Sequence, residues 1–270
     1  TYVIGKATKG TAMEYQSIRV TEQDDYGVIT LNRPEVKNAF NTQMRAEILH
    51  ATKALANSAR AIVITGTGDA FCSGQDLGDR ATVANTDLER TLRDEYMPMI
   101  RAIADCPVPV IAAVNGAAAG AGTALALAAD VVIATESAIF LQAFARIGLI
   151  PDAGVTHFLP QHVGFARAMG AALFAEPVTA KQAAEWGMIW EAVPDSAFEA
   201  RWKDRASKLA SGPTTAYIGI KEAMRASAAN SLEDQLILEA KLQGRCGKTR
   251  DFREGVMAFL EKRPAQYEGR

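Results

Sequence analysis

The sequence predicts an α/β protein whose sheet is covered on both faces, followed by a helical C-terminal region. Short all-apolar runs alternate with helical patterns up to about residue 200, and charged helical patterns alone follow. Strands that are apolar at every position are typical of parallel sheets with helices on both sides. The composition, 270 residues with 49 % hydrophobic and 22 % charged, excludes a disordered or disulfide-framework chain.

The first elements are predicted to be a hairpin and a helix. Residues 15–31 contain two short strand patterns around a turn rich in Asp and Gly. Residues 32–34 break the pattern. Asn41 can cap a helix that runs to about Ala56, because apolar residues recur there at helical spacing.

Further strands and helices alternate along the rest of the core. The apolar run at 61–65 predicts a buried strand, and the glycine-rich segment 66–77 predicts a loop without regular structure. Strands are then expected over 107–114, 130–135 and 138–140, with helices over 87–105 and 123–129. Beyond the core, the predicted helices cover 199–211, 214–228, 231–246 and 251–262.

These patterns divide the chain into a core over residues 13–200 and a helical region over 201–270. Met13 is a candidate natural start, and residues 1–12 are predicted to be a tag or an unstructured extension without signal-peptide character. The last thirty residues carry eight basic and four acidic side chains. A local positive bias in the helical region follows.

Charge and cysteine usage exclude several classes of function. A net charge of −2 and a pI near 6.0 argue against a nucleic-acid-binding protein. The three cysteines are widely separated, which offers neither a disulfide ladder nor a paired-cysteine metal site and predicts a cytoplasmic protein. The histidines also lack metal-ligand spacing, so no metal is expected. The cysteines are Cys72, Cys106 and Cys246, and the histidines are His50, His157 and His162.

One uncharged stretch, residues 106–129, is long enough to cross a bilayer. It contains Pro107, Pro109, Asn115 and three glycines, and alanine dominates it. A buried strand followed by a closely packed helix explains this composition better than a membrane span. No association with a membrane is expected.

Two glycine-bearing turns are the first candidates for chemistry. They lie at 71–77 and 115–122, each after a predicted buried strand. Each places unpaired backbone N–H groups at the carboxyl end of a strand, and the second leads into a helix N-terminus. Side by side, they would form an oxyanion hole. The alternative is that these glycines only permit tight turns and close packing.

The second turn also contains Gly120-Ala-Gly-Thr-Ala124, which resembles the dinucleotide-binding fingerprint G-x-G-x-x-A. That fingerprint belongs near the start of a βαβ unit, with an acidic residue about twenty positions later. Here it lies in mid-chain, and position 140 is Phe. The chain contains neither a phosphate-binding loop nor a G-x-S-x-G nucleophile elbow.

Asp152 stands in an unusually apolar segment, GLIPDAG at 148–154. In a solvated loop it would be a surface or helix-capping residue. In a cavity, desolvation would raise its pKa and suit it to proton transfer.

Four motifs in this order resemble the enoyl-CoA hydratase/isomerase (crotonase) superfamily: LNRPEVKNAF, AFCSGQDL, PVIAAVNGAAAGAG and GLIPDAG. The resemblance covers the chain from Met13 onward. The segments 167–174, 183–193 and 251–263 are most similar to the 2-(1,2-epoxy-1,2-dihydrophenyl)acetyl-CoA isomerases of bacterial phenylacetate degradation. The resemblance implies a crotonase-like ββα spiral core and a helical C-terminal region that forms a homotrimer or a hexamer built as a dimer of trimers.

The resemblance also implies an acyl-CoA ligand and places the family's functional residues on this chain. The oxyanion-hole amides fall on Gln75 and Ala121, and the catalytic aspartate of the epoxyphenylacetyl-CoA isomerases falls on Asp152. The two hydratase glutamates fall on Ala124 and Phe144, which cannot move a proton. The residues implied in CoA binding are Val36, Lys37, Ala39, Ser73, Gln75, Asp76 and Leu77.

The function implied is isomerisation of a CoA thioester by α-proton abstraction and enolate stabilisation. The expected reaction converts 1,2-epoxyphenylacetyl-CoA to its oxepin form, with a second activity that shifts a 3,4 double bond to 2,3. No cofactor is implied beyond the coenzyme A of the substrate. The alternatives are an enoyl-CoA hydratase or a fatty-acyl enoyl-CoA isomerase, a non-catalytic or RNA-associated scaffold, and, most remotely, a nicotinamide-dependent oxidoreductase.

Overall fold

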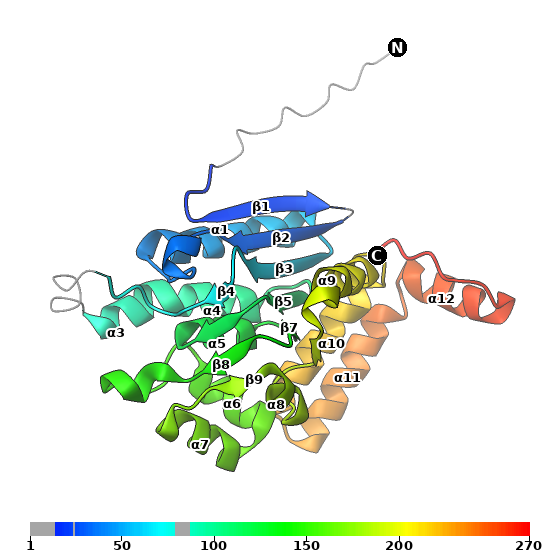
Figure 1. The fold of residues 1–270 in the computed structure, drawn as a ribbon. Coiled ribbons are helices and arrows are strands. Elements are labelled where there is room, and N and C mark those ends of the chain that lie inside the picture. The colour runs from blue at the N-terminus through cyan, green and yellow to red at the C-terminus, as the bar shows by residue number, and fades with distance from the viewer. Residues whose placement is uncertain (1–13, 24, 79–86) are drawn as a thin grey trace.

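Two sheets organise the protein in the computed structural model, which describes residues 14–23, 25–78 and 87–270. The larger sheet has the order β1-β2-β3-β5-β7-β10, and the smaller has the order β4-β6-β8-β9 (Figure 1). In the larger sheet only β1 and β2 pair antiparallel. Its strands are β1 (Ile18–Gln23), β2 (Tyr26–Leu31), β3 (Ala61–Gly66), β5 (Val110–Val114), β7 (Val131–Thr135) and β10 (Glu191–Val193).

Alternate residues of the larger sheet enter two different cores. On one face, Ile62 and Ile64 of β3 join the main core together with α1 (Thr42–Ser58) and α5 (Ala121–Ala128). On the other face, Val63 of β3 packs with Phe198 and Trp202 of α9 (Asp195–Ala210). The prediction of a sheet buried on both faces is therefore confirmed.

The smaller sheet consists of very short strands: β4 (Ala70–Cys72), β6 (Ala117–Ala119), β8 (Ile139–Leu141) and β9 (Val178–Thr179). The prediction that 66–77 lacks regular structure was wrong at β4. This strand pairs in parallel with β6, which was also not predicted. Strands of three residues carry too little periodicity to be recognised, and only their pairing defines them.

Helices cover the sheets, and those that were predicted lie close to their expected ranges. Asn41 caps α1 through its side chain, and Asp87 caps the segment that contains α3 (Leu88–Thr91), a π-helical turn (Leu92–Tyr96) and α4 (Met97–Ala104). The remaining core helices, which were not predicted, are α6 (Val155–Val163), α7 (Phe165–Phe174) and α8 (Ala180–Glu185), and short 3₁₀ turns occupy Pro34–Val36 and Ala143–Ile147.

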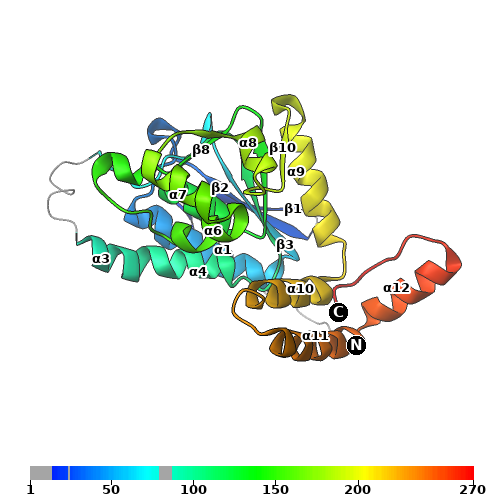
Figure 2. The same cartoon turned by 90° about the horizontal axis from the view of Figure 1, so that it is seen from below.

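The C-terminal region contains α10 (Thr214–Ala226), α11 (Leu232–Cys246) and α12 (Arg250–Glu261). Helix α9 crosses the predicted boundary at residue 200 and packs on the larger sheet. Asp130, just before β7, pairs with Lys221 and Arg225 of α10 and ties this region to the core. Helix α12 projects from the body of the molecule in both views (Figures 1 and 2).

Two predictions concerned a possible membrane span and the N-terminal extension. Within the described ranges, no helix is both long and apolar enough to span a membrane, and residues 106–129 fold as β5, β6 and α5 instead. The predicted tag or extension at residues 1–12 lies outside the described residues.

Candidate active site

The two predicted glycine turns lie together at one edge of the smaller sheet. Strands β4 and β6 are parallel neighbours, so the turns that follow them emerge at the same end. Gly74 and Gly120 have φ values of +94° and +52°, which L side chains rarely adopt. A Cβ on Gly74 would lie 2.9 Å from the Ala119 carbonyl oxygen and 3.5 Å from the Ala121 nitrogen. The turns that carry Gln75 and Ala121 are therefore in contact.

The main chain around Gln75 is held by Phe40. The Phe40 N–H donates to the Gly74 carbonyl at 2.7 Å, and the Asp76 N–H donates to the Phe40 carbonyl at 3.0 Å. The C=O and N–H of one trans peptide point in opposite directions. Because the Gly74 carbonyl points toward Phe40, the Gln75 N–H points away from it. This N–H donates to no other group within the described part of the chain.

Ala121 is the first residue of α5, and its N–H has no partner within the helix. It donates to nothing else among residues 14–23, 25–78 and 87–270. The helix packs tightly on the end of β4, since a Cβ on Gly122 would lie 2.2 Å from the Cys72 carbonyl oxygen. Two unpaired N–H groups, one at the positive end of a helix, can together stabilise a negatively charged oxygen.

Asp152 is a partly buried acid in the segment that precedes α6. Its pKa is raised to about 6, and desolvation by burial is the cause. Ala153 and Gly154 hold positive φ values of +50° and +92°, and a Cβ on Gly154 would lie 3.7 Å from Ile100 of α4. Asp152 also acts electrostatically on Tyr96, which supports a location near α4. A carboxyl with a pKa near neutrality can both accept and return a proton.

The two positions to which the motif resemblance assigns the hydratase glutamates, 124 and 144, carry no acid. Phe144 is almost fully buried, and its Cζ lies 3.7 Å from the position that a Cβ on Gly120 would take. Ala124 is completely buried in α5. Neither side chain can activate a water molecule.

The residues predicted to bind CoA form two adjoining segments. The Ser73 N–H donates to the Lys37 carbonyl at 3.0 Å, and the Ser73 hydroxyl donates to the Val36 carbonyl at 3.2 Å. Lys37, Ser73 and Leu77 are exposed, whereas Ala39 is buried.

Asp76 stabilises the second of these segments. It accepts from the Gly78 N–H and pairs with Arg33 at 2.9 Å, and these contacts lower its pKa. Through these two contacts Asp76 stabilises the conformation of the 73–78 turn.

Three side chains near Gln75 were not predicted from the sequence: Arg45, Glu95 and Tyr96. Arg45 is only 3 % exposed and interrupts the buried face of α1, next to Met44 and Ile48. A charged residue within an apolar helical face was the signal that could have identified it, because a buried charge requires a partner. Its charge partner, Glu95, comes from a different helical segment, which periodicity does not show.

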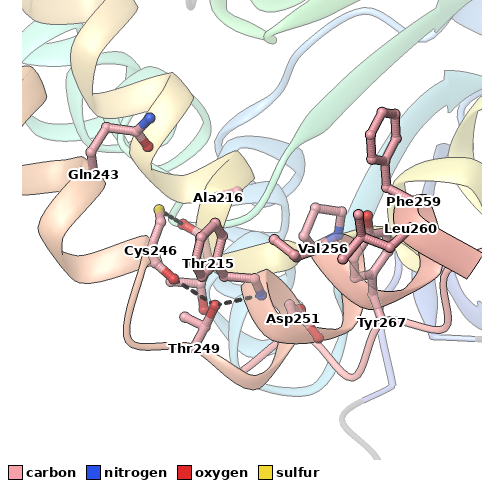
Figure 3. A pocket seen from close by; sticks show the side chains of 13 residues that line it. Thr215, Ala216, Gln243, Cys246, Thr249, Asp251, Val256, Phe259, Leu260 and Tyr267 are labelled. Atoms are coloured by element: carbon pink, nitrogen blue, oxygen red, sulfur yellow. Dashed lines mark hydrogen bonds between the residues drawn. The ribbon is translucent and has the colours of Figure 1, made fainter.

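Other candidate chemistries find no support in the geometry. Burial raises the pKa of Cys72 to about 12, so its thiol stays protonated at neutral pH and is a poor nucleophile. No group of three potential metal ligands occurs within the ranges that the structure describes. A cavity of about 430 Å³ lies away from Asp152, between α10, α11 and α12, and is lined by residues such as Thr215, Cys246 and Phe259 (Figure 3).

Comparison with known proteins assigns the family. The sequence matches the enoyl-CoA hydratase/isomerase family over residues 21–270. The chain belongs to this family. The resemblance carried by the four sequence motifs is therefore confirmed, and so is the crotonase fold. The solved structure of a Mycobacterium abscessus protein, described as a "putative Enoyl-CoA hydratase/isomerase", superposes with a TM-score of 0.89 at 36 % identity, covering 94 % of this chain and all of the other.

Curated relatives of this family member carry both hydratase and isomerase names. A protein of Rhodobacter capsulatus named "Probable enoyl-CoA hydratase" is 58 % identical, over 96 % of this chain and 100 % of its own length. The "1,2-epoxyphenylacetyl-CoA isomerase" of Escherichia coli is 45 % identical, over 90 % and 94 % respectively. These names support the family's activity on acyl-CoA thioesters. The residues of the site, and not the names, distinguish a hydratase from an isomerase.

Proposed function

We propose that this family member is an acyl-CoA isomerase in which Asp152 moves a proton at the α carbon of the thioester. The observation that carries the proposal is the half-buried Asp152 carboxyl, with its pKa raised to about 6, in a site that lacks both hydratase glutamates. At neutral pH most of this carboxyl is ionised and can act as a base. A general base works best when its pKa lies close to the working pH.

The N–H groups of Gln75 and Ala121 would stabilise the enolate oxygen as the proton leaves. Their turns touch, and neither N–H has another partner within the described part of the chain. The protonated Asp152 can then return the proton to a different carbon, which moves the double bond. The exposed residues among the 36–39 and 73–77 segments would hold the coenzyme A portion, and no further cofactor is required.

For the substrate, we propose 1,2-epoxyphenylacetyl-CoA, with conversion of 3-enoyl-CoA to 2-enoyl-CoA as a second activity. The 45 % identity to the Escherichia coli epoxyphenylacetyl-CoA isomerase supports this choice. A hydratase acting on fatty enoyl-CoA is the second candidate. It is favoured by the name of the 58 % identical relative, although Ala124 and Phe144 oppose it.

The decisive experiment compares two reactions of the purified protein. We expect hydration of crotonyl-CoA to be far slower than isomerisation of a 3-enoyl-CoA, because no second acid is available to activate water. Ring-expansion of 1,2-epoxyphenylacetyl-CoA, followed by product absorbance, tests the substrate separately. Comparable rates of hydration and isomerisation would contradict the assignment as an isomerase.

A further inference from the structure

A buried arginine lies directly behind the Gln75 turn. The Arg45 guanidinium donates through Nε to Glu95 Oε2 at 2.9 Å and through Nη2 to the same oxygen at 2.5 Å. Its Nη1 donates to Gln75 Oε1 at 2.8 Å. Glu95 therefore balances the charge, and one nitrogen of Arg45 remains directed at the side chain of Gln75.

Tyr96 provides the second donor to the same oxygen. Its hydroxyl donates to Gln75 Oε1 at 2.5 Å, and the Arg45 guanidinium carbon lies 4.7 Å from the centre of its ring. The side-chain carbonyl of Gln75 thus accepts from two groups that are almost completely buried. Holding one oxygen with two buried donors restricts the side chain far more than a solvent-exposed contact would.

The helix that supplies Glu95 and Tyr96 is locally irregular. Both residues belong to the π-helical turn Leu92–Tyr96, between α3 and α4. Consecutive residues of a regular helix point about 100° apart, yet here both reach Arg45. Such π-helical turns are often found at functional sites.

Gln75 is consequently fixed through both its main chain and its side chain. Phe40 holds the peptides on either side of it, while Arg45 and Tyr96 hold its side chain. Arg45 Nη1 also reaches the Phe40 carbonyl at 3.4 Å and connects the two sets of contacts. Both sets of contacts therefore restrain the residue whose N–H is the candidate donor.

We propose that Arg45 and Tyr96 are positioning residues, which hold the Gln75 side chain so that its backbone N–H stays directed at the thioester oxygen. This inference rests on the proposed function, since it assumes that the Gln75 N–H takes part in an oxyanion hole. Neither residue needs to touch the substrate. Catalysis by such donors depends on their alignment, and small displacements reduce the rate strongly.

The test removes the Tyr96 hydroxyl alone. We expect Tyr96→Phe to lower kcat roughly 5- to 50-fold with KM nearly unchanged, because the N–H loses alignment in the transition state. Tyr26→Phe is the matched control: Tyr26 is also buried, and its hydroxyl donates to another glutamine oxygen, Gln23 Oε1, at 3.1 Å. The control should keep the parent kcat.

A double-mutant cycle shows whether Tyr96 acts through Gln75. Gln75→Leu keeps the backbone N–H and removes the side-chain acceptor, so the double variant should be no slower than Gln75→Leu alone. The pH midpoint of kcat/KM should stay at the parent value. Multiplicative losses, or a shifted midpoint, would mean that Tyr96 acts through Asp152 or the substrate and would overturn the inference. Gln75→Asn replaces Gln75→Leu if the latter does not fold.

The carbonyl stretching frequency of bound butyryl-CoA, labelled with ¹³C at the thioester carbonyl, reports on the proposed oxyanion hole without turnover. The parent should bind it at a lower frequency than in water, and Tyr96→Phe should lose part of that shift while Tyr26→Phe keeps it. A normal shift in Tyr96→Phe would contradict the positioning role and leave the proposed function intact. The absence of any shift in the parent would instead contradict the oxyanion hole itself, and with it this inference.

Discussion

At the scale of single residues, Asp152 shows how burial tunes an acid without a partner charge. Desolvation raises its pKa to about 6, and no ion among residues 14–23, 25–78 and 87–270 contributes to the shift. Asp76, in contrast, is held by the Gly78 N–H and Arg33, and its pKa is lowered. The first environment favours proton transfer, whereas the second favours a permanently charged anchor.

We predict that Asp152→Asn lowers turnover by roughly 10²–10⁴ while acyl-CoA affinity stays nearly unchanged, because the base is lost and the shape is kept. In the parent, kcat/KM should rise with pH through about 6 and then level off, since the carboxylate is the active form. Steady-state kinetics between pH 5 and 8 measures both. Asp204→Asn, at an exposed position of α9, is the control. A flat profile below pH 6 would argue for another base.

The same shift has a consequence for stability. Between the ordinary Asp pKa near 3.9 and about 6, the folded chain retains a proton that the unfolded chain has lost, so this carboxyl lowers the free energy of unfolding as the pH rises through that window. At pH 7 Asp152→Asn should therefore be more stable than the parent by roughly 1–2 kcal/mol, after allowance for solvent screening. Urea unfolding at pH 4 should show almost no gain.

At the scale of elements, α5 links the main core to the candidate site. Every residue of this helix is buried, including the hydroxyl-bearing Thr123, which donates to the Ala118 carbonyl at 2.7 Å. Its first turn approaches β4 so closely that only a glycine fits at position 122. The position of the Ala121 N–H thus depends on the packing of a whole helix.

Gly122→Ala should destabilise the fold by roughly 2–4 kcal/mol, because the new methyl group would collide with the Cys72 carbonyl oxygen and displace α5. Gly244→Ala in α11 is the matched control, since no described residue outside the surrounding helix backbone lies within 4 Å of the added Cβ. There the better helix propensity should stabilise by roughly 0.5–1 kcal/mol. Thermal unfolding of both variants measures the difference. Equal effects would mean that α5 can move freely relative to β4.

Ala121→Pro tests the backbone donor at the start of α5. Proline is tolerated in a first helical turn, so the fold should survive, but the N–H is deleted. We expect a loss of roughly 3–4 kcal/mol in transition-state stabilisation, whereas Ala121→Gly should be mild. Binding of acyl-CoA esters, measured by calorimetry, shows that the site persists. A folded Ala121→Pro protein with near-parent turnover would show that this turn only serves packing.

At the scale of the whole molecule, the C-terminal helices expose an apolar surface that a single chain leaves uncovered. Leu232, Leu236 and Ile237 of α11 and Phe259 and Leu260 of α12 are all more than half exposed. The cavity between α10, α11 and α12 adjoins this surface (Figure 3). Large exposed apolar patches are typical of subunit interfaces, which supports the proposal of a homotrimer or a dimer of trimers.

We therefore expect sedimentation velocity to give three or six times the chain mass of 28.9 kDa. Phe259→Glu, which places a charge at an 83 % exposed apolar position, should shift the distribution toward smaller species. Ala54→Glu adds the same charge to an exposed position of α1 and should leave the mass unchanged. A monomeric parent protein would contradict the proposal.

Hydrophobic periodicity and local motifs were sufficient to predict many of the helices and strands. The helix after Asn41, the buried strands at 61–65 and 130–135 and the four C-terminal helices could be predicted because each is long or apolar enough to carry its own pattern. Asp152 and the two glycine turns were also recognisable in the sequence, since an acid among apolar residues and glycines after buried strands are local features.

Contacts between distant segments required the tertiary structure. The three-residue strands β4 and β6 exist only through their pairing, and that pairing brings the Gln75 and Ala121 turns together. Arg45 and Tyr96 meet Gln75 from two separate helices. The raised pKa of Asp152 likewise results from what packs around it. Desolvation and hydrogen-bond geometry depend on neighbours in space, and a sequence shows only neighbours along the chain.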